Sequence, residues 1–140
     1  MIIITKEKLE CNALKMKLKP RPCCGAIVQF EGVVRNHHQG KQVSHIIYEC
    51  YDAMAEKELQ LICEEAKSNW PIHQVLIAHR TGRIEVNEVS LILFVSSPHR
   101  KESFEASQYI IDKLKERVPI WKKEGYVDGQ TAWVECQHTA

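Results

Sequence analysis

Two long segments with helical periodicity constrain the fold of this chain more than any other feature. The first is expected over residues 53–69 with Asp52 as its N-cap, and the second begins at Ser97-Pro98 with Ser97 as its N-cap. Pro119 stops the second segment, because proline disrupts a helix interior. Side chains at helical spacing predict one buried face on each helix: Ala55, Leu59, Ile62, Cys63 and Ala66 on the first, and Phe104, Ser107, Ile111, Leu114 and Val118 on the second.

Short alternating and apolar segments around the two helices predict a sheet. Strands are expected over residues 2–4, 25–35, 43–51, 75–80, 90–96 and 131–135, with a glycine turn and a candidate short strand within 81–88 and a weak helix over 7–18. The polar segment 36–41 is expected to join the strands 25–35 and 43–51 in a hairpin. Because hairpin-like connections outnumber βαβ crossovers, this order predicts a single α+β domain over residues 1–140, with a mainly antiparallel sheet and two long helices packed on it.

The charge balance and the cysteine spacing argue against several classes of protein. Nineteen basic and 18 acidic residues give a net charge of +1, so bulk charge does not direct the chain to nucleic acid or to a membrane. No apolar run approaches the ~20 residues of a membrane span. The six cysteines form no Cys-x-x-Cys motif and no secretion signal precedes them, so we expect a cytoplasmic protein with reduced thiols and no metal site. The adjacent Cys23 and Cys24 are interpreted as two small, half-buried residues before a strand.

Cations at the ends of predicted elements are the candidates for chemistry, since nucleotide-binding, serine-hydrolase and zinc-protease motifs are all missing. Arg35 ends a strand, and His99 and Arg100 open a helix whose free N–H groups favour a bound anion. Lys115 lies one turn after Ile111, at the edge of the apolar face of the same helix. Each of these cations is also compatible with an exposed surface position, which is the commoner place for a lysine such as Lys115, and the residues alone leave both interpretations open.

Six short motifs follow one another between about Gly25 and Trp133. They are Phe30-Glu-Gly-Val-Val-Arg35, Tyr48-Glu-x-Tyr51-x-x-Met54-Ala55, His79-Arg80-x-Gly82, Ser96-Ser-x-His-Arg100, Asp112-x-x-Lys115 and Pro119-Ile-Trp-Lys-Lys-Glu124. Each motif alone is weak, whereas their common order and spacing are specific. In these motifs, over most of its length, the chain resembles the family of large, catalytic subunits of molybdopterin synthase.

The resemblance implies a fold of the α/β-hammerhead type and a sulfurtransferase of molybdenum cofactor biosynthesis. The family converts cyclic pyranopterin monophosphate (precursor Z) to molybdopterin by adding the two sulfurs of its dithiolene. The sulfur arrives as a thiocarboxylate on the C-terminal Gly-Gly tail of a small ubiquitin-like subunit. Two large subunits form a homodimer, and one small subunit docks on each to give a heterotetramer. The resemblance implies no cofactor and no metal.

The resemblance also implies which residues form the site. Lys115 is expected to assist catalysis as a general acid or base or covalently, and Lys122 to orient the tail and stabilise charge. The residues expected to bind substrate are Phe30, Val33, Val34, Arg35, His99, Arg100, Ile111, Lys115, Lys122, Lys123 and Glu124. Family members can add a basic residue from the C-terminal segment of the second large subunit. In this chain Gln137 stands near that place, and His138 is the candidate substitute.

Three other functions are compatible with parts of the sequence. A module that binds a ubiquitin-like tail without catalysis would use the same groove. A single-stranded RNA binder would stack bases on Phe30, Tyr48 and Tyr51, although the charge near zero disfavours it. A thiol enzyme would use Cys23 or Cys24 with a histidine, and no sequence feature places a base beside either cysteine.

Overall fold

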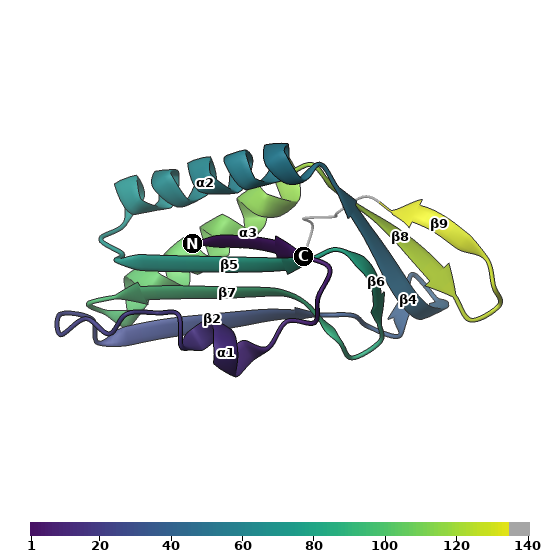
Figure 1. The fold of residues 1–140 in the computed structure, drawn as a ribbon, viewed down its shortest axis with the longest axis horizontal. Coiled ribbons are helices and arrows are strands. Elements are labelled where there is room, and N and C mark those ends of the chain that lie inside the picture. The colour runs from purple at the N-terminus through teal and green to yellow at the C-terminus, as the bar shows by residue number, and fades with distance from the viewer. Residues whose placement is uncertain (135–140) are drawn as a thin grey trace.

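The computed structural model describes residues 1–134, in which three helices and two β-sheets form the fold (Figure 1). The elements in chain order are β1 (Ile2–Thr5), α1 (Cys11–Lys15), β2 (Ala26–Val33), β3 (His37–His38), β4 (Lys41–Cys50), α2 (Asp52–Asn69), β5 (Gln74–Arg80), β6 (Gly82–Glu85), β7 (Val89–Ser97), α3 (Arg100–Arg117), β8 (Ile120–Tyr126) and β9 (Thr131–Val134).

The first sheet has the strand order β1-β5-β7-β2, and the apolar strand β7 lies at its centre. Residues 91–95 of β7 are all buried, because β5 and β2 pair with its two sides and helices cover both faces. On one face α2 and α3 form the main core, to which Leu59 and Ile110 contribute fully buried side chains. On the other face α1 packs through Leu14. The helix α3 therefore lies fixed along this sheet.

The second sheet is built around β4, which pairs with β8, with β6 and with the short β3. The strand β9 extends this sheet by pairing with β8. Val34, Val43, Ile46 and Ile84 form a separate small core here. Figure 1 shows the second sheet beyond one end of the first sheet, away from the start of α3. Only the C-terminal end of α3 therefore lies near the second sheet.

The predicted α+β class is confirmed, with two long helices on a mainly antiparallel sheet and one parallel pair, β1 and β5. The predicted hairpin between residues 25–35 and 43–51 is wrong, because β2 pairs with β7 and β4 belongs to the second sheet. The Val34 N–H donates to the Glu88 carbonyl, and the Asn87 N–H donates to the Val34 carbonyl. These bonds hold the end of β2 against the turn before β7, so the chain changes sheet at this point.

The long helices occur where the periodicity predicts them, but their first residues differ from the prediction. The N-cap of α2 is Tyr51, and that of α3 is His99, two residues after the predicted start. Ser97 does not cap α3, because it remains in β7 and its hydroxyl donates to the His99 carbonyl at 2.5 Å. Phe104, predicted to face inward, is 62% exposed.

Two further elements differ from the sequence prediction. Only Cys11–Lys15 of the expected helix 7–18 is helical, although Leu14 is buried as expected. The strand β8 was not predicted, because its Lys-Lys-Glu segment has a low β-propensity. The last predicted strand is present as Thr131–Val134, and residue 135 lies outside the described residues. No helix within residues 1–134 has both the length and the apolar character needed to cross a membrane.

Candidate active site

A cleft of about 460 Å³ lies where the second sheet meets the end of β2, the end of β5 and the last turns of α3. This volume is within the range of about 300–1,000 Å³ typical of small-molecule sites. Residues from both sheets and from α3 line the cleft, and most of them are polar or aromatic, among them Phe30, Arg35, His38, Tyr48, His79, Lys115, Lys122 and Glu124; Val33 adds an apolar side chain. Residues far apart in the sequence thus share one concave surface.

The strand β8 determines which of its charged side chains faces the cleft. Lys122 and Glu124 line the cleft, whereas the Lys123 ammonium lies 5.6 Å from the centre of the Trp133 ring. Successive side chains of a strand point to opposite faces, so Lys122 and Lys123 face opposite sides of the second sheet. Lys123, predicted to bind substrate, therefore does not line the cleft.

Glu124 is a buried carboxylate that is already held by two neighbours. It is 2% exposed and accepts hydrogen bonds from the His38 Nδ1–H at 2.9 Å and from the Tyr126 hydroxyl at 3.0 Å. Burial and the nearby carboxylate raise the pKa of Tyr126. Glu124 therefore orients the His38 ring at the edge of the cleft.

His79 provides a buried, neutral imidazole in the wall of the cleft. It is 4% exposed, and its Nδ1–H donates to the Arg80 carbonyl at 2.8 Å. Burial lowers its pKa to about 4, so the ring is uncharged at neutral pH. Its ring lies edge-on to the Tyr48 ring, with centroids 5.0 Å apart. With the proton on Nδ1, Nε2 is left as a hydrogen-bond acceptor.

Three cations of the cleft have no carboxylate partner within residues 1–134: Arg35, Lys115 and Lys122. Several cations elsewhere are paired, as in the ion pairs Arg80–Glu88 and Arg117–Glu65. Arg35 and Lys115 are exposed and Lys122 is half-buried, so their charged groups can reach a ligand. Unpaired cations around one concavity favour an anionic ligand.

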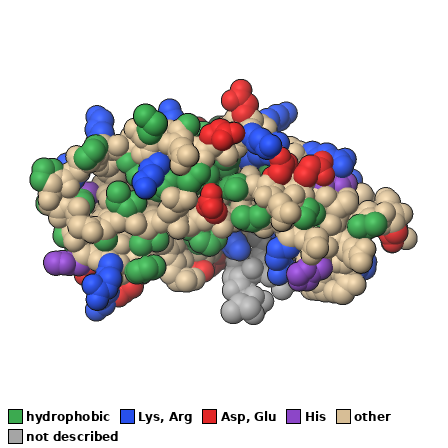
Figure 2. Space-filling model, turned by 90° about the horizontal axis from the view of Figure 1, so that it is seen from below, with side chains coloured by type: hydrophobic (Ala, Val, Ile, Leu, Met, Phe, Trp, Pro, Cys, Tyr) green, Lys and Arg blue, Asp and Glu red, His purple; other side chains and the backbone are tan. Residues whose placement is uncertain are grey.

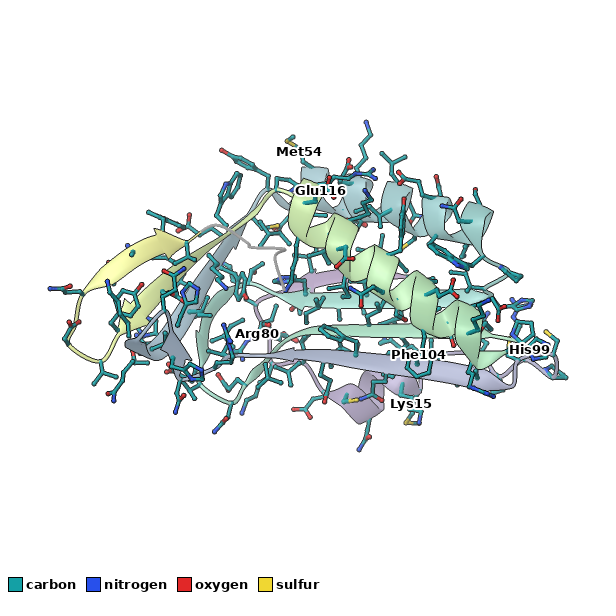
Figure 3. All side chains as sticks on the ribbon, turned by 180° about the vertical axis from the view of Figure 1, so that it is seen from behind. Lys15, Met54, Arg80, His99, Phe104 and Glu116 are labelled. Atoms are coloured by element: carbon teal, nitrogen blue, oxygen red, sulfur yellow. The ribbon has the colours of Figure 1, made fainter. Side chains whose placement is uncertain are left out.

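Four predicted site residues occupy other places in the fold. Val34 is 2% exposed and packs in the small core of the second sheet, and Ile111 belongs to the main core beneath α3. His99 and Arg100 stand at the beginning of α3, whereas Lys115 stands near its end. At 1.5 Å rise per residue, Arg100 and Lys115 lie about 22 Å apart along the helix. Figure 3 shows His99 and Glu116 at opposite ends of α3. Within one chain, His99 and Arg100 therefore do not join the cleft.

An open groove of about 800 Å³ adjoins the cleft. Lys115 and Ile120 line both hollows, so the groove leads directly to Lys115. Its other walls include Tyr51, Trp121 and Trp133, which are 63%, 45% and 56% exposed. The Tyr51 and Trp121 rings meet edge to face at 5.1 Å. Exposed aromatic side chains of this kind are typical of a surface that binds another chain.

Sequence reasoning missed the roles of His38 and His79 in this site. The His79-Arg80 pair was recognised only as a family motif, and its burial results from tertiary packing. His38 belongs to the polar segment 36–41, which has no pattern that predicts a contact with Glu124, 86 residues away. Gln137 and His138, the candidates from a second copy, lie outside the described residues. Within residues 1–134, one group of side chains has the spacing of metal ligands, namely Cys23, Cys24 and His73.

Comparisons with known proteins agree with one another. The model of the MoaE protein family matches residues 4–117. The molybdopterin synthase catalytic subunit of Bos taurus is 44% identical over 133 residues, which are 95% of this chain and 70% of that protein. The catalytic subunit from Halalkalibacterium halodurans is 48% identical over 116 residues, which are 83% of this chain and 74% of that protein. A crystal structure of molybdopterin synthase from Staphylococcus aureus has a TM-score of 0.86 at 35% identity and covers 94% of this chain and 95% of its own.

Proposed function

Because the chain belongs to the MoaE protein family, with relatives named molybdopterin synthase catalytic subunits, we propose that the cleft beside Lys115 is where this enzyme transfers sulfur. The observation that carries the proposal is the set of three unpaired cations, Arg35, Lys115 and Lys122, around one concave surface. The substrate is precursor Z, whose cyclic phosphate is an anion. The planar guanidinium group of Arg35 suits phosphate oxygens. Arg35 follows the end of β2 by two residues and is exposed, so its side chain can make this contact.

The groove beside the cleft fits the second reactant. A thiocarboxylate on the C-terminal Gly-Gly tail of a small ubiquitin-like subunit is a narrow, anionic chain end. The groove holds apolar surface from Tyr51, Trp121 and Trp133 and ends at Lys115. The tail therefore reaches the substrate at the residue that the two hollows share.

Lys115 and Lys122 have different electrostatic roles in the proposed reaction. When the thiocarboxylate sulfur attacks a carbon of the pterin side chain, negative charge develops on oxygen. The Lys115 ammonium, at the junction of the groove and the cleft, stabilises that charge or exchanges a proton with it. Lys122, which lines the cleft but not the groove, orients the end of the tail where it enters the cleft. His38, fixed by Glu124, and neutral His79 present hydrogen-bonding groups to the substrate.

A homodimer explains why His99 and Arg100 lie far from the cleft of their own chain. The strand β2 is an edge strand of the first sheet, with its outer side unpaired among the described residues. Its first residue pairs with Ser97 next to the start of α3, where the Gly25 N–H donates to the Pro98 carbonyl at 3.2 Å. Its last residue, Val33, lines the cleft. The first residue of β2 thus lies near the start of α3, and its last residue lies near the cleft at the end of α3.

Antiparallel pairing of two β2 strands across a two-fold axis places the start of one strand beside the end of the other. The seven intervals of β2 span roughly 23 Å, close to the length of α3 between Arg100 and Lys115. His99 and Arg100 of one copy then approach the cleft of the other copy. Figure 2, seen from the side of β2, shows hydrophobic side chains over this face, and Ile27 of β2 is 53% exposed. These features support a homodimer with two shared sites.

Reconstitution tests the reaction itself. The chain is incubated with precursor Z and the thiocarboxylated small subunit, and dithiolene formation is measured. Wild-type protein is expected to form molybdopterin, and Lys122→Ala to lose up to about 10² in rate. Lys123→Ala is the matched control, because Lys123 faces the other side of β8. Equal losses of rate in the two variants would show that the cleft is not where sulfur is transferred.

Mixing two impaired variants, assayed well below saturation with precursor Z, tests whether each site is shared. If Lys115 of one copy works with Arg100 of the other, a mixed dimer of Lys115→Ala and Arg100→Ala chains contains one intact site and one doubly defective site. Random mixing should then restore about a quarter of wild-type activity. Absence of any recovery, in a mixture shown to exchange subunits, contradicts the shared site. Light scattering on the purified chain measures the dimer directly.

A further inference from the structure

Cys23, Cys24 and His73 form a cluster at the end of the first sheet opposite the cleft. Cys23 and Cys24 precede β2, and His73 immediately precedes β5. Their ligand atoms all lie within 4.8 Å of one another, and Cys23 Sγ is 3.5 Å from His73 Nε2. Cys23 is exposed, whereas Cys24 and His73 are half-buried. The structure thus places a base beside a cysteine pair for which the sequence offered none.

The spacing of the cluster agrees with a tetrahedral metal site. With Zn–S bonds of ~2.3 Å and Zn–N bonds of ~2.1 Å, a sulfur and a nitrogen on one zinc ion are about 3.6 Å apart, and two sulfurs about 3.8 Å apart. The observed sulfur–nitrogen distance of 3.5 Å nearly equals the first value. All three side chains can therefore reach one ion by small rotations.

The backbone around the cluster is tied down by hydrogen bonds. The His73 N–H donates to the Ser96 carbonyl at 2.8 Å, and the Cys24 N–H donates to the Arg21 carbonyl at 3.0 Å. The Ser96 hydroxyl accepts a bond from the Gln74 N–H at 3.1 Å, and Ser96 pairs with Ile27 of β2. Ser96 therefore connects the two strands that follow the ligand-bearing segments. Supporting hydrogen bonds of this kind orient ligands in known metal sites.

We propose that Cys23, Cys24 and His73 bind one thiophilic metal ion, with Zn²⁺ as the ion that fits best. Two sulfurs and one imidazole nitrogen favour zinc over magnesium or calcium, which prefer oxygen ligands. Three protein ligands leave the fourth position to water or another donor. When the ion binds, the two thiols lose their protons to solvent and the imidazole stays neutral. Within one chain the cluster lies at the end of the sheet opposite the cleft, and it shares no residue with the cleft.

Occupancy of this site would also order the start of α3. The neighbouring Gly25 N–H is bonded to the Pro98 carbonyl, one residue before His99. A metal ion bound by both the segment before β2 and the segment before β5 would restrict the motion of the backbone next to the start of α3. Since a ligand that binds only the folded state stabilises it, Zn²⁺ should raise the melting temperature of the reduced chain.

Cobalt substitution tests the site directly. The reduced, metal-free full-length chain is titrated with Co²⁺ without oxygen. The expected result is one equivalent bound, with the visible bands of tetrahedral cobalt and a near-ultraviolet thiolate-to-cobalt band, both removed by Zn²⁺. Cys23→Ser, Cys24→Ser and His73→Ala should each weaken binding more than tenfold, because each removes one of the three ligands.

Cys11→Ser is the matched control, because Cys11 is a free, half-buried thiol on α1, outside the cluster. This variant should keep both the affinity and the spectrum. The proposal is overturned if no thiolate-to-cobalt band forms, or if the band survives in Cys23→Ser and His73→Ala chains that melt at the same temperature as wild type. A Cys23–Cys24 disulfide that persists under reducing conditions would also overturn it.

Discussion

The two ends of α3 differ in what surrounds them, although both carry cations predicted to act on the same substrate. Near its C-terminal end, Lys115 lies beneath the second sheet, and Arg117 is bonded to Glu58 and Glu65 of α2. At its N-terminal end, His99 and Arg100 are exposed. Within residues 1–134, the cleft therefore lies at the C-terminal end of α3 and not at its N-terminal end. We therefore expect the N-terminal end of α3 to meet the substrate only where a second copy of the chain completes the site.

The largest expected effect lies at the C-terminal end, in Lys115→Ala. Loss of one preorganised charge donor typically costs about 10²–10³ in rate. The variant should lose this much molybdopterin formation in single-turnover assays. Because Lys115 is exposed and has no ion-pair partner within residues 1–134, its melting temperature and its binding of the small subunit should not change.

Lys115→Arg separates two roles of the same residue. Arginine keeps the positive charge but does not deprotonate, so partial activity indicates electrostatic stabilisation and complete loss indicates proton transfer or covalent chemistry. Turnover of Lys115→Ala near the wild-type rate would show that the two ends of α3 do not differ in catalysis.

The second prediction concerns stability against pH, and it depends on the buried His79. Its pKa is about 4 in the folded chain and 6.5 in an unfolded one, so the unfolded state binds the proton first as the pH falls. Stability is therefore complete above pH 6.5 and falls as the pH drops from 6.5 to 4. The gap corresponds to a loss of about 3 kcal/mol at most.

Urea unfolding at several pH values measures this loss. The exposed His99 supplies the control, since His99→Asn should leave the slope between pH 6.5 and 4 unchanged. In the His79→Gln variant, the free energy of unfolding should depend less on pH between 6.5 and 4, whatever the overall stability of the variant. A flat profile for the wild-type chain would contradict the assignment of a neutral, buried imidazole to the cleft.

The third prediction moves to the N-terminal end of α3. Arg100→Ala should weaken the binding of precursor Z by about 1.5–3 kcal/mol, the value of a charged hydrogen bond. The neighbouring Lys101, which is exposed and only 4.0 Å from Glu105, provides the control and should have no effect when replaced by alanine. Calorimetric titration of each purified protein with precursor Z measures both affinities. Unchanged affinity in Arg100→Ala would mean that this end of the helix does not meet the substrate.

The sequence predicts that Lys115 and Lys122 line the same cleft more reliably than it predicts the rest of the site. Both lie on elements that follow each other closely, α3 and β8, so their proximity is nearly local. The separation of Arg100 from Lys115 was also predictable, because fifteen helical residues span about 22 Å whatever the tertiary structure. Treating all the cations as one pocket in one chain neglected that length.

Other features depend on contacts that no local pattern contains. The sheet change after β2 results from hydrogen bonds of Val34 to the turn before β7, more than fifty residues later. The burial of His79 depends on the second sheet packing over the end of β5. The orientation of Lys123 away from the cleft follows from strand alternation, but only once β8 is known to be a strand. Alternation was hidden there because lysines are poor indicators of a strand.

The smallest expected effect concerns what holds the C-terminal end of α3 in place. Arg117 donates two hydrogen bonds to Glu65, at 2.7 and 2.8 Å, and one to Glu58 at 2.7 Å, and Tyr109 donates to Glu65 at 2.7 Å. These bonds lower the pKa of Glu65 to about 2, chiefly through Arg117. Since the unfolded value is 4.5, this contribution to stability is present above pH 4.5 and disappears as the pH falls through about 2.

Arg117→Ala should therefore lower the melting temperature at pH 7 by a few degrees, as expected for a solvent-accessible network. It should also lose less stability than wild type between pH 4.5 and 2, because the Glu65 carboxylate has lost its main partner. Lys101→Ala at the other end breaks a longer, more exposed pair and should change neither value. If both variants melt alike and have the same acid profile, the two ends of α3 are equally anchored. The position of Lys115 would then depend on its other surroundings, namely the second sheet and the buried neighbours Leu114 and Val118 in the main core.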